Sequence, residues 1–212
     1  MIKRVVIFFL VFISLAVQAR PVSYTGGKTL MQMNNADYSS LHAHYSPTYL
    51  YSLGYLYENW RDEEWVLHAV QFNRLVKRWN HRAAQANLYV KSGLGFFDSY
   101  ASNPPQNHGV GGFAGIAADW ENRRFFVSYE NRYRNVDSLA RFFIQRARIG
   151  IAPYIADYGD LHTWLMLRVD HRPTQRDSAR VTALLRLFKG DYLTEIGVDE
   201  DGHALFNWVI QF

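Results

Sequence analysis

The segment Ala204-Leu-Phe-Asn-Trp-Val-Ile-Gln-Phe212 carries a large apolar side chain at every second position. In a β-strand this spacing puts Asn207 and Gln211 on one face and the apolar groups on the other. The apolar set comprises Phe206, Trp208, Ile210 and Phe212. A bacterial outer-membrane barrel closes on such a strand, with its apolar groups toward lipid. The segment therefore predicts an outer-membrane β-barrel, and we expect these four residues to form the carboxy-terminal signal for the outer-membrane assembly machinery.

The opposite end of the chain has the pattern of an export signal. Lys3 and Arg4 precede an apolar run from Val5 to Val17 that only Ser14 interrupts, and Val17-Gln18-Ala19 offers small residues at the positions that a signal peptidase reads. A charged start, a short apolar run and a small-residue exit are typical of a secretory signal peptide. We expect cleavage after Ala19, with residues 1–19 as the signal peptide and residues 20–212 as one barrel domain. An uncleaved anchor is the alternative, although the run is shorter than a bilayer span, which needs about 20 residues.

Composition agrees with a barrel. The chain holds 14 Tyr, 14 Phe and 6 Trp, which suits the aromatic girdles of a membrane barrel. There is no Cys, so neither disulfides nor thiolate chemistry is available. Without Lys3 and Arg4 the chain has 21 basic and 19 acidic residues. This near-balance gives no reason to expect a nucleic-acid partner, and we expect outer-membrane lipid and lipopolysaccharide as surroundings instead.

Alternating and turn-bounded segments predict twelve antiparallel strands in an all-β, up-and-down transmembrane barrel. The expected strands are 29–35, 40–46, 49–60, 65–76, 85–97, 112–121, 124–133, 144–155, 162–170, 180–189, 192–199 and 204–212. Short turns are expected after even strands and longer outer loops after odd ones. A ten-strand barrel without the first pair is the main rival. A soluble periplasmic sandwich or lipocalin-like barrel, with its apolar residues inside, is the alternative fold.

Charged residues fall on the face that we assign to the lumen, because a basic residue on the lipid face costs about 2–4 kcal/mol near the midplane. The predicted lumen charges are Lys91, Asp119, Glu121, Glu130, Arg132, Arg146, Arg148, Arg168, Arg186 and Glu195. They form either a salt-bridge lattice that fills the barrel or a slot that selects a small permeant. Val70, Phe72 and Phe188 break the pattern, because they fall on faces assigned to the interior.

The first hairpin contains a Met and His pattern. Met31 and Met33 share a face of one strand, and His42 and His44 share a face of the next. A turn centred between Asp37 and Tyr38 would place Met33 opposite His42 and Met31 opposite His44. Thioether and imidazole ligands together suit Cu(I), so these four residues are the candidate metal site and copper is the one candidate cofactor. The alternative is an apolar wall beside a polar lumen.

No catalytic set emerges from the sequence. His68, His162 and His203 are candidate bases, and Ser128 lies beside Glu130, but no Ser and His have a spacing typical of barrel lipases. We therefore expect a non-enzymatic protein. The segment Arg132-Tyr-Arg-Asn135, followed by Arg141, is predicted near an outer loop, where arginine could contact lipopolysaccharide phosphates; a solvated loop rim is the simpler interpretation.

Five segments resemble a small family of proteobacterial outer-membrane barrel proteins: Arg20-Pro-Val-Ser-Tyr-Thr-Gly-Gly27, Met31-Gln-Met-Asn34, His44-Tyr-Ser-Pro-Thr48, Arg78-Trp-Asn80 and residues 160–171. That resemblance implies an association with copper-handling gene clusters. In residues 146–212, the strand pattern with Gly150-Ile-Ala-Pro153, Leu185-Arg-Leu-Phe188 and the terminal Phe212 also resembles the carboxy-terminal barrel of bacteriophage-adsorption outer-membrane receptors. The expected role is envelope transport or interaction, with copper handling and then lipid modification as alternatives.

Overall fold

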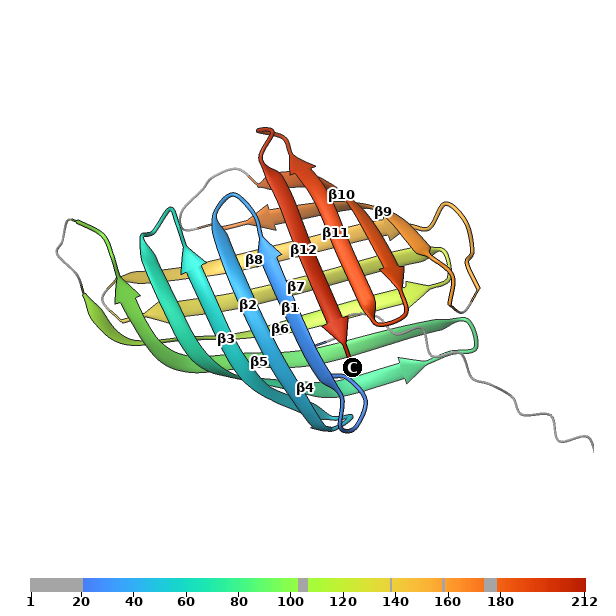
Figure 1. The fold of residues 1–212 in the computed structure, drawn as a ribbon, viewed down its shortest axis with the longest axis horizontal. Coiled ribbons are helices and arrows are strands. Elements are labelled where there is room, and N and C mark those ends of the chain that lie inside the picture. The colour runs from blue at the N-terminus through green and yellow to red at the C-terminus, as the bar shows by residue number, and fades with distance from the viewer. Residues whose placement is uncertain (1–20, 103–106, 138, 158, 174–178) are drawn as a thin grey trace, which may run out of the picture.

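The computed structural model describes residues 21–102, 107–137, 139–157, 159–173 and 179–212, so the predicted signal peptide lies outside the described residues. Twelve antiparallel strands form a closed barrel in which each strand pairs with the next and β12 pairs with β1 (Figure 1). The strands are β1 Lys28–Asn34, β2 Tyr38–Thr48, β3 Tyr51–Trp60, β4 Trp65–Asn80, β5 Ala84–Ser99, β6 His108–Asn122, β7 Phe125–Val136, β8 Ala140–Ile151, β9 His162–His171, β10 Arg180–Lys189, β11 Tyr192–Asp199 and β12 Ala204–Gln211. The described residues contain no helix long and apolar enough to span a membrane.

The closed ladder confirms the twelve-strand barrel and excludes the ten-strand count, because β1 pairs with both β2 and β12. One expected difference in loop length is wrong. β8 ends at Ile151, so the connection to β9 covers residues 152–161 and is not short. Pro153 has no N–H to continue the ladder there. In contrast, β7 and β8 pair almost to their tips, which leaves only residues 137–139 between them.

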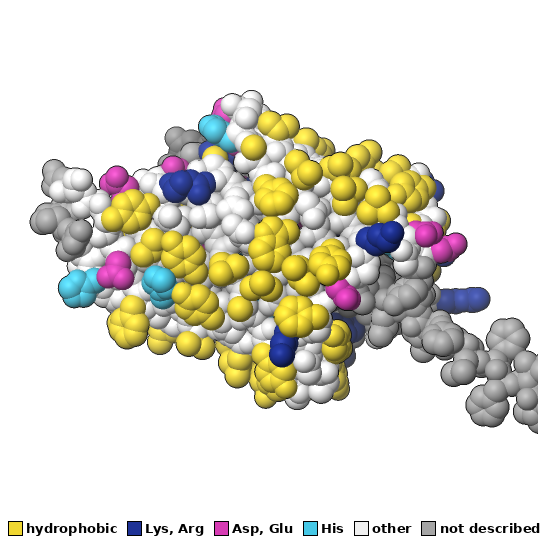
Figure 2. All heavy atoms as spheres, in the orientation of Figure 1, with side chains coloured by type: hydrophobic (Ala, Val, Ile, Leu, Met, Phe, Trp, Pro, Cys, Tyr) yellow, Lys and Arg dark blue, Asp and Glu magenta, His cyan; other side chains and the backbone are white. Residues whose placement is uncertain are grey.

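The outer surface of the barrel is apolar. Val70, Leu94 and Phe96 expose 67%, 66% and 71% of their surface although each lies within a strand. On the face shown in Figure 2, hydrophobic side chains spread over the middle of the molecule, and charged ones lie mostly toward its ends. A soluble barrel would turn these groups inward. An apolar exterior around a charged interior is the arrangement of a barrel in the bacterial outer membrane.

Strand β4 faces opposite to the sequence-based assignment. Val70 and Phe72 point outward, whereas Leu67, Ala69 and Gln71 are buried inside. The bulge in β4, between Leu75 and Lys77, lies beyond these positions and is not the cause. The reason is that the inner face of β4 is itself apolar near one end of the barrel, where it joins a buried cluster. Phe188, by contrast, does lie inside, against the cluster of Met31, Leu193 and Val209.

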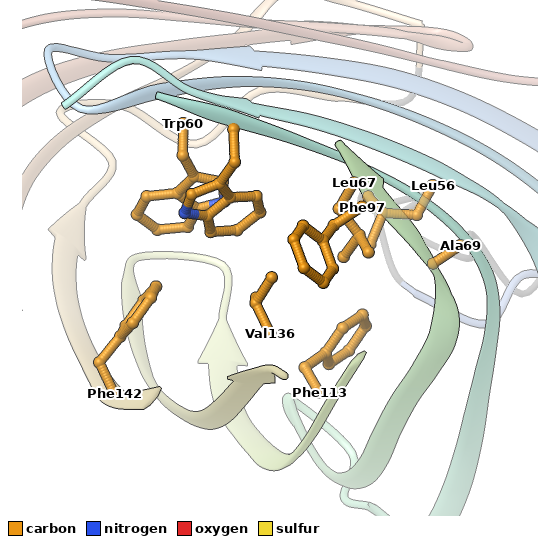
Figure 3. Close-up of a cluster of buried hydrophobic side chains, with 9 residues drawn as sticks. Leu56, Trp60, Leu67, Ala69, Phe97, Phe113, Val136 and Phe142 are labelled. Atoms are coloured by element: carbon orange, nitrogen blue, oxygen red, sulfur yellow. The ribbon is translucent and has the colours of Figure 1, made fainter. Parts of the chain in front are cut away.

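An aromatic layer fills the end of the barrel that carries the connections after odd strands. Trp60 of β3 stacks on Trp65 of β4 with 5.5 Å between ring centroids, and it meets the edge of Phe142 of β8 at 5.2 Å (Figure 3). Leu67 and Phe97 complete the layer, and both are fully buried. β1 begins and β12 ends at the opposite end of the barrel, which is the periplasmic end in barrels of this kind. The aromatic layer therefore lies in the outer half of the lumen.

The segment before β1 enters the periplasmic end. Val22 is 1% exposed and packs against Leu75, Tyr89 and Ala117, which point into the lumen from β4, β5 and β6. The Pro21 carbonyl accepts a hydrogen bond of 2.6 Å from the Ser52 hydroxyl. This segment thus narrows the lumen at its periplasmic end, and the aromatic layer narrows it at its outer end.

Candidate functional site: a chamber in the lumen

A cavity of about 170 Å³ lies inside the barrel between Trp60 on the outer side and Pro21 on the periplasmic side. Six basic side chains and three carboxylates line it. The basic set is Lys91, Arg132, Arg134, Arg146, Arg148 and Arg186, and the acidic set is Glu58, Asp119 and Glu130. The chamber therefore has a basic wall, which favours anions over cations.

Side chains from opposite walls meet above the chamber. The Tyr38 hydroxyl on β2 accepts a hydrogen bond of 3.1 Å from Nη2 of Arg146 on β8. These strands are six apart in either direction around the barrel. Because Tyr38 also stacks on Trp60, with ring centroids 4.6 Å apart, this bridge continues the aromatic layer into the polar interior.

Glu58 organises the outer half of the charged lattice. Its carboxylate lies 2.5 Å from Nη1 of Arg134 and 3.3 Å from Nη1 of Arg132. Arg132 also pairs with Glu130 at 2.9 Å, and Glu130 pairs with Lys91 at 2.7 Å. Positive and negative side chains alternate along this series of ion pairs, so each carboxylate is neutralised by its neighbours. This part of the lumen is therefore a salt-bridge lattice.

The part of the lattice on β8 to β11 holds more arginine than acid. Asp170 pairs with Arg146 at 2.6 Å and with Arg168 at 2.5 Å. Glu195 pairs with Arg186 at 2.7 Å and with Arg148 at 3.2 Å. Each carboxylate therefore serves two guanidinium groups.

All ten predicted lumen charges occupy inward-facing positions of their strands. Three further members of the lattice were missed: Glu58, Arg134 and Asp170. Arg132-Tyr-Arg-Asn135 lies next to the outer end of β7, near an outer turn as expected. Its arginines point into the lumen, however, because Arg134 is fully buried and the Arg132 side chain is 15% exposed. Glu58 shares one face of β3 with Leu56 and Trp60, and all three are buried. The charge of Glu58 was the signal that could have assigned this face to the lumen.

The Met and His hairpin forms with a different register from the one expected. Met31 lies opposite His42, and Met33 lies opposite Ser40. The turn is centred between Ala36 and Asp37, because the Asn35 side chain accepts hydrogen bonds from the backbone N–H groups of Asp37 and Tyr38 and ends β1 early. The predicted pairs are therefore wrong by two positions. Met31, Met33, His42 and His44 nevertheless all line the chamber.

A directed chain of hydrogen bonds fixes the side chain of Gln71. The Pro21 carbonyl can only accept, so Ser52 donates to it. Ser52 Oγ accepts from Asn73 Nδ2 at 3.1 Å, and Asn73 Oδ1 accepts from Gln71 Nε2 at 3.0 Å. This order leaves Gln71 Oε1 as an acceptor that faces the two histidines.

The orientation of Gln71 in turn fixes both imidazole rings. Its Oε1 lies 3.1 Å from His42 Nδ1 and 3.3 Å from His44 Nε2, so both nitrogens donate. His42 Nε2 then accepts from the Ser40 hydroxyl at 3.0 Å. His44 Nδ1 keeps a buried lone pair with no hydrogen-bond partner among the described residues.

Ser40, His42 and Gln71 have the order of a nucleophile, a base and an orienting group. Sequence reasoning missed this set because Gln71 is 29 residues from His42. Ser40 is 2% exposed and is not among the described residues that line the chamber, so its hydroxyl is not presented to a substrate.

The structure does not bring the other candidate bases to Ser128. Ser128 lies on the chamber wall, whereas His68 lies on the outer surface, bonded to the Tyr55 hydroxyl at 2.6 Å. His162 packs beside Phe188 at the periplasmic end of β9, and His203 lies in the outer turn after β11.

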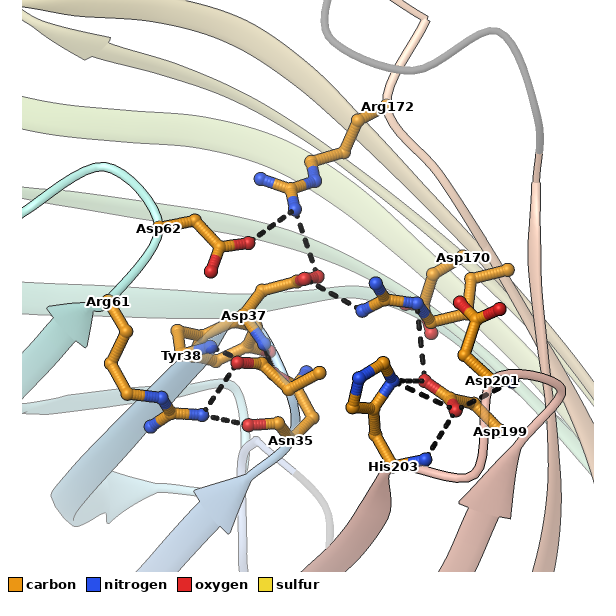
Figure 4. A network of polar contacts seen from close by, with 12 residues as sticks. Asn35, Asp37, Tyr38, Arg61, Asp62, Asp170, Arg172, Asp199, Asp201 and His203 are labelled. Atoms are coloured by element: carbon orange, nitrogen blue, oxygen red, sulfur yellow. Dashed lines mark hydrogen bonds and ion pairs between the residues drawn. The ribbon is translucent and has the colours of Figure 1, made fainter.

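Charged groups join across the outer mouth (Figure 4). Asp37, in the turn after β1, pairs with Arg172 at 3.0 Å and with Arg180 at 2.7 Å. Arg172 also lies over the Trp60 ring, 5.5 Å from its centroid. The ion pairs of Asp37, Arg172 and Arg180 at the outer mouth therefore contact the aromatic layer through Arg172.

The carboxy-terminal residues are arranged as a lipid-facing strand. Phe206 and Phe212 expose 47% and 57% of their surface, and Trp208 and Ile210 share their face of the chain. Asn207 and Gln211 point inward and are buried. Asn207 Nδ2 donates to Glu195 at 2.7 Å, which links this strand to the lattice.

Comparison with known proteins adds little to this geometry. No family model and no curated protein matches the chain. One similar solved structure is a loop L8 deletion mutant of OmpT, an outer membrane protein of Vibrio cholerae. It is 10% identical, with a TM-score of 0.29, and the match covers 88% of this chain and 97% of that one. The architecture therefore rests on the strand pairing and the side-chain distribution described above.

Proposed function

We propose that this protein is a non-enzymatic outer-membrane barrel that holds a small solute in a closed lumen chamber, in an envelope transport or interaction role. The contact between Tyr38 and Arg146 carries the proposal, because it joins opposite walls above the chamber. A barrel of this strand number lies between packed eight-strand barrels and open sixteen-strand porins. Here the lumen is crossed by side chains, which supports a binding chamber over a diffusion pore.

Two further observations support a closed chamber. The aromatic layer around Trp60 and Trp65 lies on its outer side. Val22, buried against inward-facing side chains, lies on its periplasmic side. A solute would enter only when one of these layers moves, so the protein would bind a solute or pass it in steps.

Conductance across a planar lipid bilayer tests this proposal. The refolded chain from residue 20 onward is expected to give no steady open-pore current. A variant that lacks residues 21–26 is the matched comparison, and it should conduct more often because the periplasmic layer is gone. A stable ohmic pore in the unmodified protein would contradict the proposal.

A Cu(I) site in the same chamber is the second candidate function. Met31, Met33, His42 and His44 line one cavity, and the Gln71 carbonyl leaves a buried lone pair on His44 Nδ1. Ligating histidines typically donate their other ring N–H to such an oxygen. The basic wall opposes a cation, which is why this function is placed second.

Titration with Cu(I) in the presence of a competing chelator tests the second candidate. A His42→Ala/His44→Ala variant should lose tight binding, whereas a His68→Ala variant, altered on the outer surface, should retain it. Indistinguishable Cu(I) affinities for the first variant and the unmodified protein would end the copper hypothesis.

A further inference from the structure

The part of the lattice on β8 to β11 carries an excess of positive charge. Four guanidinium groups form ion pairs with only two carboxylates, Asp170 and Glu195. The four are Arg146, Arg148, Arg168 and Arg186. The nearby Glu130 is already shared by Lys91 and Arg132. Asp119, the ladder neighbour of Ser128, also lines the chamber and accepts a hydrogen bond of 2.7 Å from Asn87 Nδ2. Within the described part of the chain, four guanidinium groups against two paired carboxylates still give this cluster more positive than negative charge.

Arg148 and Arg168 make this excess costly. They lie directly opposite each other in the ladder between β8 and β9, and like charges in that position are destabilising. Their side chains are only 12% and 4% exposed. A buried cation without its own counter-ion is strongly unfavourable, so the pair calls for an additional anion nearby.

Arg148 has donor capacity to offer that anion. It shares Glu195 Oε1 with Arg186, which holds this oxygen through two N–H groups at 2.9 and 2.7 Å. Arg148 Nε is buried and makes no hydrogen bond within the described residues. An unsatisfied buried donor on a charged group costs more than a neutral one.

The chamber adjoins this donor. Arg146, Arg148 and Arg186 line it, together with Ser128, which is the ladder neighbour of Arg148 on β7. Planar guanidinium forks match the oxygens of phosphate-like and carboxylate groups, and a hydroxyl adds one more donor. The cavity of about 170 Å³ has roughly the liquid volume of five or six water molecules, which admits a small tetrahedral anion.

We propose that the chamber binds one small tetrahedral oxyanion, of the phosphate or sulfate class, through Arg148 with Arg146, Arg186 and Ser128 around it. This inference rests on the proposed closed chamber and names the chemistry of its solute. A tetrahedral oxyanion presents several acceptor oxygens at once, so it can accept hydrogen bonds from more than one of the guanidinium groups that line the chamber. Chloride presents no such directed set of oxygens.

Calorimetric titration of the refolded protein in zwitterionic detergent tests the oxyanion site. Phosphate and sulfate are titrated separately at constant ionic strength, with chloride as the reference salt. Saturable binding with one site per chain is expected for both oxyanions. Arg148→Gln should weaken binding about tenfold or more, since it removes a charge-assisted contact. Arg123→Gln, altered at a side chain that is 62% exposed, should bind as the unmodified protein does.

A second variant guards against a folding defect. Arg148→Lys keeps the charge but removes the fork, so it should fold and still bind the oxyanions more weakly. Glu195 retains Arg186 and Asn207 as partners in both variants. Absence of saturable binding by the unmodified protein, or unweakened binding by both Arg148 variants, would overturn this inference. An open pore current would instead overturn the closed chamber itself, so the two failures are distinguishable.

Discussion

Arg172, just beyond β9, forms an ion pair of 3.3 Å with Glu63 in the connection between β3 and β4, across the outer mouth of the barrel. β9 and β3 are six strands apart in either direction, so this pair joins opposite walls. Tyr38 and Arg146 do the same deeper in the lumen. Opposite walls are thus close enough for side chains to meet at two depths, so side chains cross the lumen on the outer side of the chamber.

Glu58 should be far more important for stability than Glu63. The Glu58 side chain is 2% exposed and holds two arginines. Glu58→Gln removes the carboxylate that pairs with the buried Arg134 and leaves Arg132 with Glu130, and it is expected to cost about 3–5 kcal/mol. Glu63→Gln removes one contact of a partly exposed pair and should cost less than about 1 kcal/mol. Reversible urea unfolding of the refolded protein in lipid vesicles measures both, and equal losses would argue against Glu58 as the lattice anchor.

The bridge between Tyr38 and Arg146 should appear as energetic coupling. A double-mutant cycle with Tyr38→Phe and Arg146→Gln is expected to give about 1.5–3 kcal/mol, the range for hydrogen bonds to charged groups. Tyr133→Phe, on the outer surface of β7, replaces Tyr38→Phe in the control cycle and should be additive with Arg146→Gln within about 0.5 kcal/mol. Additivity in both cycles would mean that the walls are not joined through this contact.

The outer face of β9 should reject charge. Leu167 is 48% exposed in the middle of the strand. Leu167→Arg is expected to destabilise the barrel by about 2–4 kcal/mol in vesicles, because the side chain would lie in lipid. Tyr49→Arg, in the turn between β2 and β3, should cost about 0–1 kcal/mol. If arginine at position 167 were tolerated as well as at position 49, this face would not lie in the membrane interior.

Val22 should control access from the periplasmic side. Val22→Asp places a charge against Leu75, Tyr89 and Ala117, and burial of an unpaired charge is unfavourable. We expect the segment to leave the lumen and the rate of pore opening in planar bilayers to rise. Val110→Asp, altered at an exposed position of β6, controls for charge alone. An unchanged opening rate with Val22→Asp would show that this segment does not close the chamber.

Much of the fold follows from residue order because each strand separates lipid-facing from lumen-facing groups. Leu165, Leu167 and Val169 alternate with Trp164 and Met166, so their faces were predictable. β4 was not, because both its faces are partly apolar. The hairpin register could have been found from Asn35, whose side chain caps the turn, a property typical of Asn in turns.

The site itself was only partly predictable. The charges on the lumen face could be named from alternation, but not their partners. Glu58 and Arg134 are 76 residues apart, and they meet because of the way the closed barrel brings β3 and β7 together. The chain from Pro21 through Ser52 and Asn73 to Gln71 likewise depends on which walls come together. No spacing along the sequence encodes these contacts.

The charge and closure of the chamber can be measured together through a thiol at its wall, because the chain has no Cys of its own. Ser128→Cys would be labelled with two methanethiosulfonate reagents of similar size, one bearing a sulfonate and one a trimethylammonium group, in the presence and absence of the Val22→Asp change. With Val22 in place, both reagents should react slowly; with Val22→Asp, the sulfonate reagent should react much faster than the ammonium reagent. Rapid labelling by both reagents with Val22 intact, or faster labelling by the cation, would contradict a closed chamber with a basic wall.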